Sequence, residues 1–215
     1  EEARHSVKEQ LKAIEIELCL GKQLSSALLP AHNELAQRVA KMRRSFARLR
    51  ARLDGFERFT FIDIGCGKGK VVLEWTRLLR RHRLRQRVVG IDYYEPLLRN
   101  ARAIHQRMFG EEGDFLLADA TSLDFGTWGE RLIIFLYNPF DAAILARVLA
   151  RMPAGEIYIL YTIPVHADTL VEHGFTAIDV HHGFHPNCQT VIFRGPDAPR
   201  PARNDMDFPS NEVRP

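Results

Sequence analysis

The feature that most constrains the fold is a regular alternation of apolar runs and helical patterns, which begins at Phe59. Short runs rich in branched and aromatic residues predict strands at residues 59–64, 87–92, 114–119, 131–137, 156–163, 176–182 and 188–193. Helical patterns lie between them at residues 70–81, 96–108, 141–151 and 166–173. This alternation predicts an α/β fold with a mostly parallel sheet and helices on both faces. The segment that joins the last two strands is too short for a parallel crossover, so we expect that pair to be antiparallel.

Two further helical patterns precede the alternating region. Apolar residues recur at steps of three and four over residues 7–18 and 35–53, and each pattern stops at a glycine, Gly21 or Gly55. Each pattern has one narrow apolar seam, which must pack against another surface. After Arg194 the chain is proline-rich, polar and aperiodic, which predicts an extended tail. We therefore expect an N-terminal helical extension or cap (1–55), an α/β domain (56–195) and a tail (196–215).

The composition is that of an ordinary globular protein. Apolar residues make up 46% of the 215 residues, which is enough for a sizeable core. The formal charge of +3 is too small to indicate a nucleic-acid partner by itself. No apolar stretch approaches the ~20 residues of a membrane span and no secretory leader opens the sequence, so we expect no membrane association. The cysteines lie far apart, which argues against a disulfide framework and fits a cytoplasmic setting; they are Cys19, Cys66 and Cys188.

The stretch FIDIGCGKGK (residues 61–70) places three glycines within five positions, directly after an apolar run. Glycine inside an element costs roughly 0.5–1 kcal/mol relative to alanine, so these glycines need a reason, either a tight turn or a ligand close to the backbone. The dinucleotide fingerprint requires a glycine where this chain has Lys70, and the P-loop requires Ser or Thr where it has Val71. The pattern that remains is D-x-G-x-G-x-G, formed by Asp63, Gly65, Gly67 and Gly69.

This pattern resembles the first motif of the class I S-adenosylmethionine-dependent methyltransferases. Asp92 ends the second predicted strand, where that family places an acidic residue on the ribose of the cofactor. Asp119 and Ala120 follow the third strand, where the family contacts the adenine. The stretch YNPF (residues 137–140) ends the fourth strand, where the family presents residues to its substrate. The resemblance covers about residues 59–194 and implies a Rossmann-like fold with S-adenosylmethionine as the cofactor.

The resemblance implies a set of cofactor-binding residues: Asp63, Gly65, Cys66, Gly67, Gly69, Asp92, Tyr93, Asp119, Ala120 and Asn138. The cofactor carries an ammonium, which Asp63 can face, and a carboxylate, which loop amides and the next helix N-terminus favour. The Asp92 carboxylate can accept from two ribose hydroxyls and would repel the 2′-phosphate of NADP. Simpler interpretations remain open: Asp63 as a turn cap, Asp92 as a solvated strand end, and Cys66 as a small residue fitted to the loop rather than a nucleophile.

The acceptor side is less constrained by the sequence. Amino-methylating members of the family often carry Asn, Asp or Ser before two prolines and an aromatic residue, whereas here Asn138 and Phe140 flank a single proline. In those members the first side chain accepts a hydrogen bond from the target nitrogen, and alignment alone can contribute ~7–11 kcal/mol. We therefore expect methylation of a nitrogen in a protein, nucleic acid or small amine, with Asn138 and Phe140 as candidate catalytic residues. The alternatives are a non-catalytic cofactor-binding module and an RNA-binding protein on the same fold.

Two polar features remain outside this site. His181, His182 and His185 lack the carboxylates or cysteines of a metal site, so we expect a polar hairpin and no metal. Arginines concentrate in two runs, residues 38–52 and 77–87. Solvated helix faces are commonly basic, so the sequence allows a nucleic-acid partner without favouring one. The sequence does not define the oligomeric state.

The two N-terminal helical patterns need a surface to pack on. Added N-terminal segments in this family often lie over the strand ends that hold the ligand. We therefore expect residues 7–53 to cap the cofactor and acceptor sites. The alternatives are packing at the sheet edge and a dimer interface.

Overall fold

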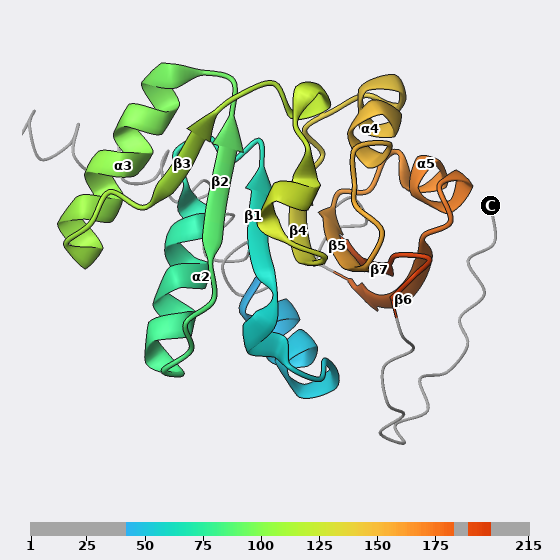
Figure 1. Ribbon diagram of the computed structural model, residues 1–215, viewed down its shortest axis with the longest axis horizontal. Coiled ribbons are helices and arrows are strands. Elements are labelled where there is room, and N and C mark those ends of the chain that lie inside the picture. Colours follow the sequence, from blue (N-terminus) through green and yellow to red (C-terminus); the bar gives the residue numbers. More distant parts are fainter. Residues whose placement is uncertain (1–41, 183–188, 199–215) are drawn as a thin grey trace, which may run out of the picture. The chain divides into compact units, whose positions relative to one another are not determined.

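The computed structural model describes residues 42–182 and 189–198, which contain a seven-stranded sheet of order β3-β2-β1-β4-β5-β7-β6 (Figure 1). The strands are β1 (Thr60–Ile64), β2 (Val88–Asp92), β3 (Asp114–Leu117), β4 (Arg131–Tyr137), β5 (Glu156–Thr162), β6 (Thr176–His181) and β7 (Thr190–Arg194). Strands β1 to β5 pair in parallel, whereas β7 is antiparallel to both β5 and β6. The predicted α/β class, the Rossmann-like sheet and the antiparallel final pair are confirmed.

The helices follow the strands closely in sequence. They are α2 (Lys70–Arg81), α3 (Glu95–Phe109), α4 (Ala142–Leu149) and α5 (Ala167–Glu172), with short 3-10 turns η1 (Phe56–Arg58), η2 (Ala120–Ser122) and η3 (Phe125–Trp128). Residues 42–52 are also helical. The bounds of β4 and α2 are those predicted, and the other strands and the helices α3, α4 and α5 differ from the predicted bounds by at most two residues at an end, where assignments commonly vary. The pattern predicted at residues 7–18 lies outside the described residues. The 3-10 turns were not predicted, because such short segments carry no periodic signal.

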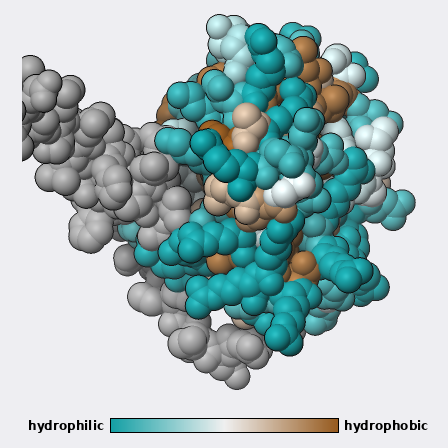
Figure 2. Space-filling model, turned by 90° about the vertical axis from the view of Figure 1, so that its left-hand side faces the viewer, coloured by the Kyte–Doolittle hydropathy of each residue, from teal (hydrophilic) through white to brown (hydrophobic). Residues whose placement is uncertain are grey.

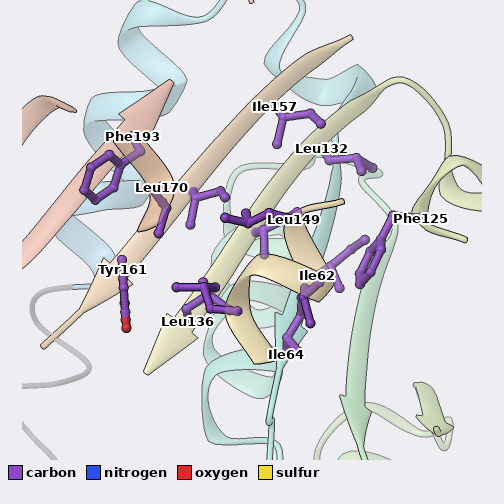
Figure 3. Close-up of a cluster of buried hydrophobic side chains, with 14 of the residues drawn as sticks. Ile62, Ile64, Phe125, Leu132, Leu136, Leu149, Ile157, Tyr161, Leu170 and Phe193 are labelled. Atoms are coloured by element: carbon purple, nitrogen blue, oxygen red, sulfur yellow. The ribbon is translucent and has the colours of Figure 1, made fainter. Parts of the chain in front are cut away.

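Helices α4 and α5 cover one face of the sheet. Along β1, Ile62 and Ile64 point to this face because strand side chains alternate between the two sides. Figure 3 shows Leu149 of α4 and Leu170 of α5 among these strand residues, and all of them are buried. A buried Leu or Ile side chain contributes about 1.5–3 kcal/mol, so this cluster holds the two short helices on the sheet.

The opposite face is covered by α2 and by the helical segment 42–52. Phe61 of β1 points to this face and stacks on Trp75 of α2 with 3.8 Å between ring centroids. Phe46 meets the same Trp75 ring edge to face at 5.0 Å. The part of the predicted N-terminal seam that the structure describes is buried here, namely Met42, Phe46, Leu49 and Leu53. Residues 42–53 thus pack on the sheet face, and the rest of the predicted cap lies outside the described residues.

The end of the described chain also returns to this face. Ala198 is buried within the same apolar cluster, and its carbonyl accepts a hydrogen bond from the Arg194 guanidinium at 2.6 Å. The first residues of the predicted tail therefore pack against the domain, and residues 199–215 lie outside the described part. Among the helices that the structure describes, none is long and apolar enough to cross a membrane.

Candidate active site

The glycine loop connects the carboxyl end of β1 to the start of α2. Gly65, Gly67 and Gly69 all have positive φ, at 76°, 54° and 71°, a region that costs other residues about 1–2 kcal/mol. A Cβ at Gly69 would lie 2.8 Å from the Phe115 ring, so this glycine is required for packing. A Cβ at Gly67 would meet nothing within 4 Å, so the protein leaves open space beside this backbone. The loop therefore combines a packing role at Gly69 with an open backbone at Gly67.

The stretch YNPF lies directly against this loop. A Cβ at Gly65 would be 3.0 Å from Cβ of Pro139, tighter than most Cβ contacts, so the loop backbone lies in close contact with Pro139. The proximity follows from the sheet order, because β1 and β4 are adjacent and Ile64 pairs with Leu136 at their carboxyl ends. The predicted cofactor loop and the predicted acceptor stretch thus form one site.

Two carboxylates lie at the centre of the site. Asp92 accepts hydrogen bonds from the backbone N–H groups of Gly67 (2.8 Å) and Tyr94 (2.9 Å), so it holds the glycine loop in place. Asp63 is only 3% exposed. Burial, and second the charge of Asp92, raise the pKa of Asp63 to about 8. A buried carboxyl beside another carboxylate favours a cationic ligand, because a cation would offset both the desolvation and the repulsion.

Cys66 lies inside the loop and is buried. Burial first, and then the charges of Asp63 and Asp92, raise the pKa of its thiol far above the usual range. A thiolate is the reactive form of cysteine, so Cys66 is unreactive at neutral pH. This environment supports its interpretation as a small residue fitted to the loop.

The ends of β2 and β3 form the next part of the site. The two ends are joined by a hydrogen bond of 3.0 Å from the Ala118 N–H to the Asp92 carbonyl. Tyr93 follows β2 and is 83% exposed, an unusual environment for a large aromatic side chain. Asp119 caps η2 by accepting from the N–H and the hydroxyl of Thr121, which holds the pKa of its carboxyl below the usual range. Ala120 is buried in the core.

Asn138 and Ile163 follow the ends of the neighbouring strands β4 and β5, and both have positive φ, at 43° and 54°. Positive φ is a marked departure for a β-branched residue such as Ile163, and such backbone strain clusters at functional sites. Phe140, the other candidate catalytic residue, is partly buried against the apolar cluster under α4 and α5. It therefore has a packing role at the edge of the site.

The amide of Asn138 has a defined orientation. Burial raises the pKa of the Tyr161 hydroxyl, against the opposing effect of the His166 backbone N–H, so the hydroxyl keeps its proton at neutral pH. That proton is donated to Oδ1 of Asn138 at 3.1 Å. Figure 3 shows the Tyr161 hydroxyl pointing away from the labelled apolar side chains of this core. The sequence does not predict Tyr161 as a site residue. Only the pairing of Leu136 with Tyr161 reveals that the ends of β4 and β5 are neighbours.

The histidines do not gather at this site. His181 is buried on β6, where burial and then Arg48 lower its pKa to about 4, against the opposing effect of Asp179. His182 follows β6, and His185 lies outside the described residues. Within the described part of the chain, no group of His, Cys, Asp or Glu residues could hold a metal ion.

A family model described as a methyltransferase domain matches residues 56–165, more than half of the chain. The matched region contains the glycine loop, Asp92, Asp119 and the YNPF stretch. The chain belongs to this methyltransferase family. It is an S-adenosylmethionine-dependent methyltransferase of class I, as the sequence predicted.

Solved structures share the fold of this methyltransferase. The magnesium protoporphyrin IX methyltransferase ChlM from Synechocystis PCC 6803, with bound S-adenosylmethionine, is 17% identical with a TM-score of 0.54; the likeness covers 74% of this chain and 79% of that one. A mutant of MtNAS in complex with S-adenosylmethionine is 18% identical with a TM-score of 0.52, over 75% of this chain and 62% of that one. No curated protein matches the sequence.

The residues of this methyltransferase fit its cofactor, S-adenosylmethionine. The buried Asp63 carboxyl lies in a position that favours a cation, and the cofactor carries both a sulfonium and an ammonium. The open space at Gly67 leaves room for a ligand against the loop backbone. The N-cap of helix α2 is Gly69, which provides no side-chain cap, so the first N–H groups of the helix are available to a carboxylate.

Proposed function

We propose that this methyltransferase transfers the methyl group of S-adenosylmethionine to a nitrogen atom held beside Asn138. The observation that carries this proposal is the hydrogen bond from Tyr161 to Oδ1 of Asn138, next to the glycine loop. An amide oxygen has two lone pairs, and Tyr161 uses one of them. The second lone pair is suited to accept from an N–H of the methyl acceptor, which turns the nitrogen lone pair away from the amide.

Each part of the cofactor has a proposed partner in the site. Asp63 holds the ammonium, and the loop backbone at Gly65, Cys66, Gly67 and Gly69 holds the amino-acid end together with the first N–H groups of α2. Asp92 binds the ribose hydroxyls through the lone pairs that Gly67 and Tyr94 leave free. Tyr93, Asp119 and Ala120 flank the adenine. When bound, S-adenosylmethionine supplies an electrophilic methyl group on its sulfonium.

The chain supplies alignment rather than acid–base chemistry. Positioning of two reactants can lower a barrier by about 7–11 kcal/mol, so a neutral nitrogen with its lone pair free needs no protein base. Asn138 orients the nitrogen, and Phe140 forms the wall next to it while packing on the core. The proton that the methylated nitrogen loses passes to water. The unpaired, buried Cys66 thiol and the wide cysteine spacing support a reducing, cytoplasmic setting for this reaction.

The test is label transfer from S-adenosylmethionine with a tritiated methyl group to extracts treated separately with protease or nuclease. We expect label on nitrogen in one of the protein, nucleic-acid or small-molecule fractions. The variant Asn138→Asp keeps an acceptor oxygen and should retain part of the activity, whereas Asn138→Leu should lose it. Label on oxygen or carbon, or equal activity of the Leu variant, would contradict the nitrogen assignment. Absence of label from every fraction would contradict the proposed transfer itself.

A further inference from the structure

The two arginine runs of the sequence meet along one line in the structure. Arg43 of the helical segment 42–52 contacts Glu74 of α2 at 2.5 Å, and Arg50 contacts His82, at the end of α2, at 2.9 Å. The contacts advance in the same direction along both helices, so segment 42–52 and α2 lie side by side and run parallel. Phe46, packed against Trp75 and His82, fixes this arrangement from beneath.

We call the exposed arginines along this line the basic seam: Arg43 and Arg50 of segment 42–52, and Arg77 and Arg81 of α2. Among the described residues, Glu74 is the acidic side chain in ion-pair contact with the seam, and its side chain is only 10% exposed. It lies 2.5 Å from Arg43 and 3.7 Å from Arg77, so one charge is shared between two arginines. Within the described part of the chain, the basic seam therefore carries several arginines for one paired carboxylate.

Neighbouring arginines of the same run are neutralised, which sets the basic seam apart. Arg80 pairs with Glu111 at 2.6 Å, and Arg87 pairs with Asp114 at 2.7 Å. Both point toward the α3 and β3 side of α2. Arginines thus have acidic partners on that side of α2, whereas the seam side exposes most of its charge to solvent.

We propose that the basic seam binds the phosphate backbone of a nucleic-acid duplex. Arg77 and Arg81 are separated by about 6 Å along α2, and Arg43 and Arg50 by about 10 Å along their helix, so the charges form an extended row rather than a pocket for one anion. A duplex carries one negative charge per ~1.7 Å of its axis and matches such a row. The guanidinium fork pairs with phosphate oxygens in a bidentate geometry.

The side chains of the basic seam favour a duplex over other polyanions. Proteins that bind single strands stack the bases on exposed aromatic rings, whereas Phe46 and Trp75 are buried under the seam. Insertion into a membrane surface needs exposed apolar side chains beside the basic ones. None of the large hydrophobic side chains that are exposed among the described residues lies in segment 42–52 or in residues 70–85. Figure 2 shows the α3 side of the domain, whose surface is also mostly hydrophilic.

The basic seam is separate from the methyl-transfer site. The glycine loop precedes Lys70, where α2 begins, whereas the seam residues Arg77 and Arg81 lie about 10 Å and 16 Å further along the helix axis. Duplex binding and methyl transfer can therefore fail independently in an experiment, and the duplex proposal does not depend on the nature of the methyl acceptor.

The test uses the full chain and a fluorescein-labelled DNA duplex of about 20 base pairs, with anisotropy recorded from about 50 to 200 mM salt. The seam variant is Arg77→Gln with Arg81→Gln, and the matched control is Arg99→Gln with Arg151→Gln, which removes equal charge from exposed positions elsewhere. We expect the seam variant to bind at least ~10-fold more weakly and to lower the slope of log K against log salt by about 2. The control should keep the wild-type affinity and slope.

Three results would overturn the proposal. The first is no duplex binding by the wild type at about 50 mM salt. The second is an equal loss of affinity in the seam variant and the control. The third is seam-dependent binding that is tighter for a single strand of the same length, or for phosphatidylserine vesicles, than for the duplex. Thermal unfolding of both variants establishes that each is folded.

Discussion

At the scale of single residues, Asp63 makes the stability of the folded protein depend on pH. Its pKa of about 8 in the folded protein lies far above the ordinary 3.8, so the folded state holds a proton that the unfolded state has lost between these pH values. The free energy of unfolding therefore falls as pH rises through this window. The variant Asp63→Asn should remove this pH dependence, as measured by urea unfolding at intervals across the window.

The same carboxyl predicts proton release on cofactor binding. Below pH 8 the empty site holds Asp63 largely protonated, and the cofactor ammonium favours the charged form, so binding should release up to one proton. Calorimetry with S-adenosylhomocysteine at neutral pH, in two buffers of different ionisation enthalpy, measures this number. Asp63→Asn is the control and should release less. Identical release by the wild type and the variant would place the proton on another group.

A substitution at Gly67 tests the ligand pocket and distinguishes an effect on ligand affinity from an effect on protein stability. Gly67→Ala places a Cβ into open space at φ 54°, so it should cost about 1–2 kcal/mol of stability while obstructing the proposed cofactor position. Gly110→Ala is the matched control, because Gly110 also has positive φ and open space but follows α3. We expect similar losses in urea unfolding, and a loss of S-adenosylhomocysteine affinity in Gly67→Ala alone. Equal affinity of the two variants would place the ligand elsewhere.

Tyr161 is predicted to position Asn138 rather than to bind the cofactor. Tyr161→Phe removes the donor to Oδ1 and leaves the ring packing in place, so the amide can turn. We expect the rate of methyl transfer to fall by ~10–100-fold, the order of effect that follows misplacement of a reacting group. Affinity for S-adenosylhomocysteine should stay unchanged, which a general structural defect would not allow. A parallel loss of affinity would assign Tyr161 to cofactor binding instead.

At the scale of secondary-structure elements, the sequence predicted those whose signal is local. The strand that ends in Asp63, the helix that begins at Lys70 and the strand that ends in Asp92 each follow from a short apolar or periodic run. Their carboxyl ends then meet because parallel strands are adjacent. The hydrogen bond between Tyr161 and Asn138 could not be predicted from the sequence, because it depends on the lateral register of β4 and β5.

The packing partner of segment 42–52 also could not be predicted from local sequence patterns. Its apolar seam was visible in the sequence, but a seam does not identify the surface that buries it. Here the partners are α2 and η1 on one face of the sheet, through the contacts of Phe46 with Trp75 and His82 and with Phe56. The two arginine runs become one surface only through this packing.

The contribution of segment 42–52 to stability is directly testable. Phe46 is 1% exposed, so Phe46→Ala should lower the free energy of unfolding by about 3–5 kcal/mol through lost burial and a cavity. Arg50→Ala, on the exposed side of the same helix, should change it by less than about 1 kcal/mol. Urea unfolding followed by Trp fluorescence measures both. A small effect of Phe46→Ala would show that this helix adds little to the stability of the fold.

At the scale of the whole molecule, one helix connects the site with the basic seam. The start of α2 is part of the glycine loop region, where parallel strands present their carboxyl ends to a ligand. The other end of α2, with segment 42–52, carries exposed arginines. A methyltransferase arranged in this way can bind a large anionic partner without covering its cofactor site.

The role of the N-terminal region can be tested by truncation, and the structure determines where the chain must be cut. Removal of residues 1–54 would delete four buried core residues, Met42, Phe46, Leu49 and Leu53. A loss of ligand affinity in that variant could then come from unfolding as well as from loss of a cap. Removal of residues 1–41 keeps that cluster intact. If these residues cap the site, affinity for S-adenosylhomocysteine should fall at least ~10-fold, because water and solvent ions then screen the contacts of Asp63. Unfolding by urea should remain cooperative. Unchanged affinity with a smaller oligomer in light scattering would assign the region to assembly instead.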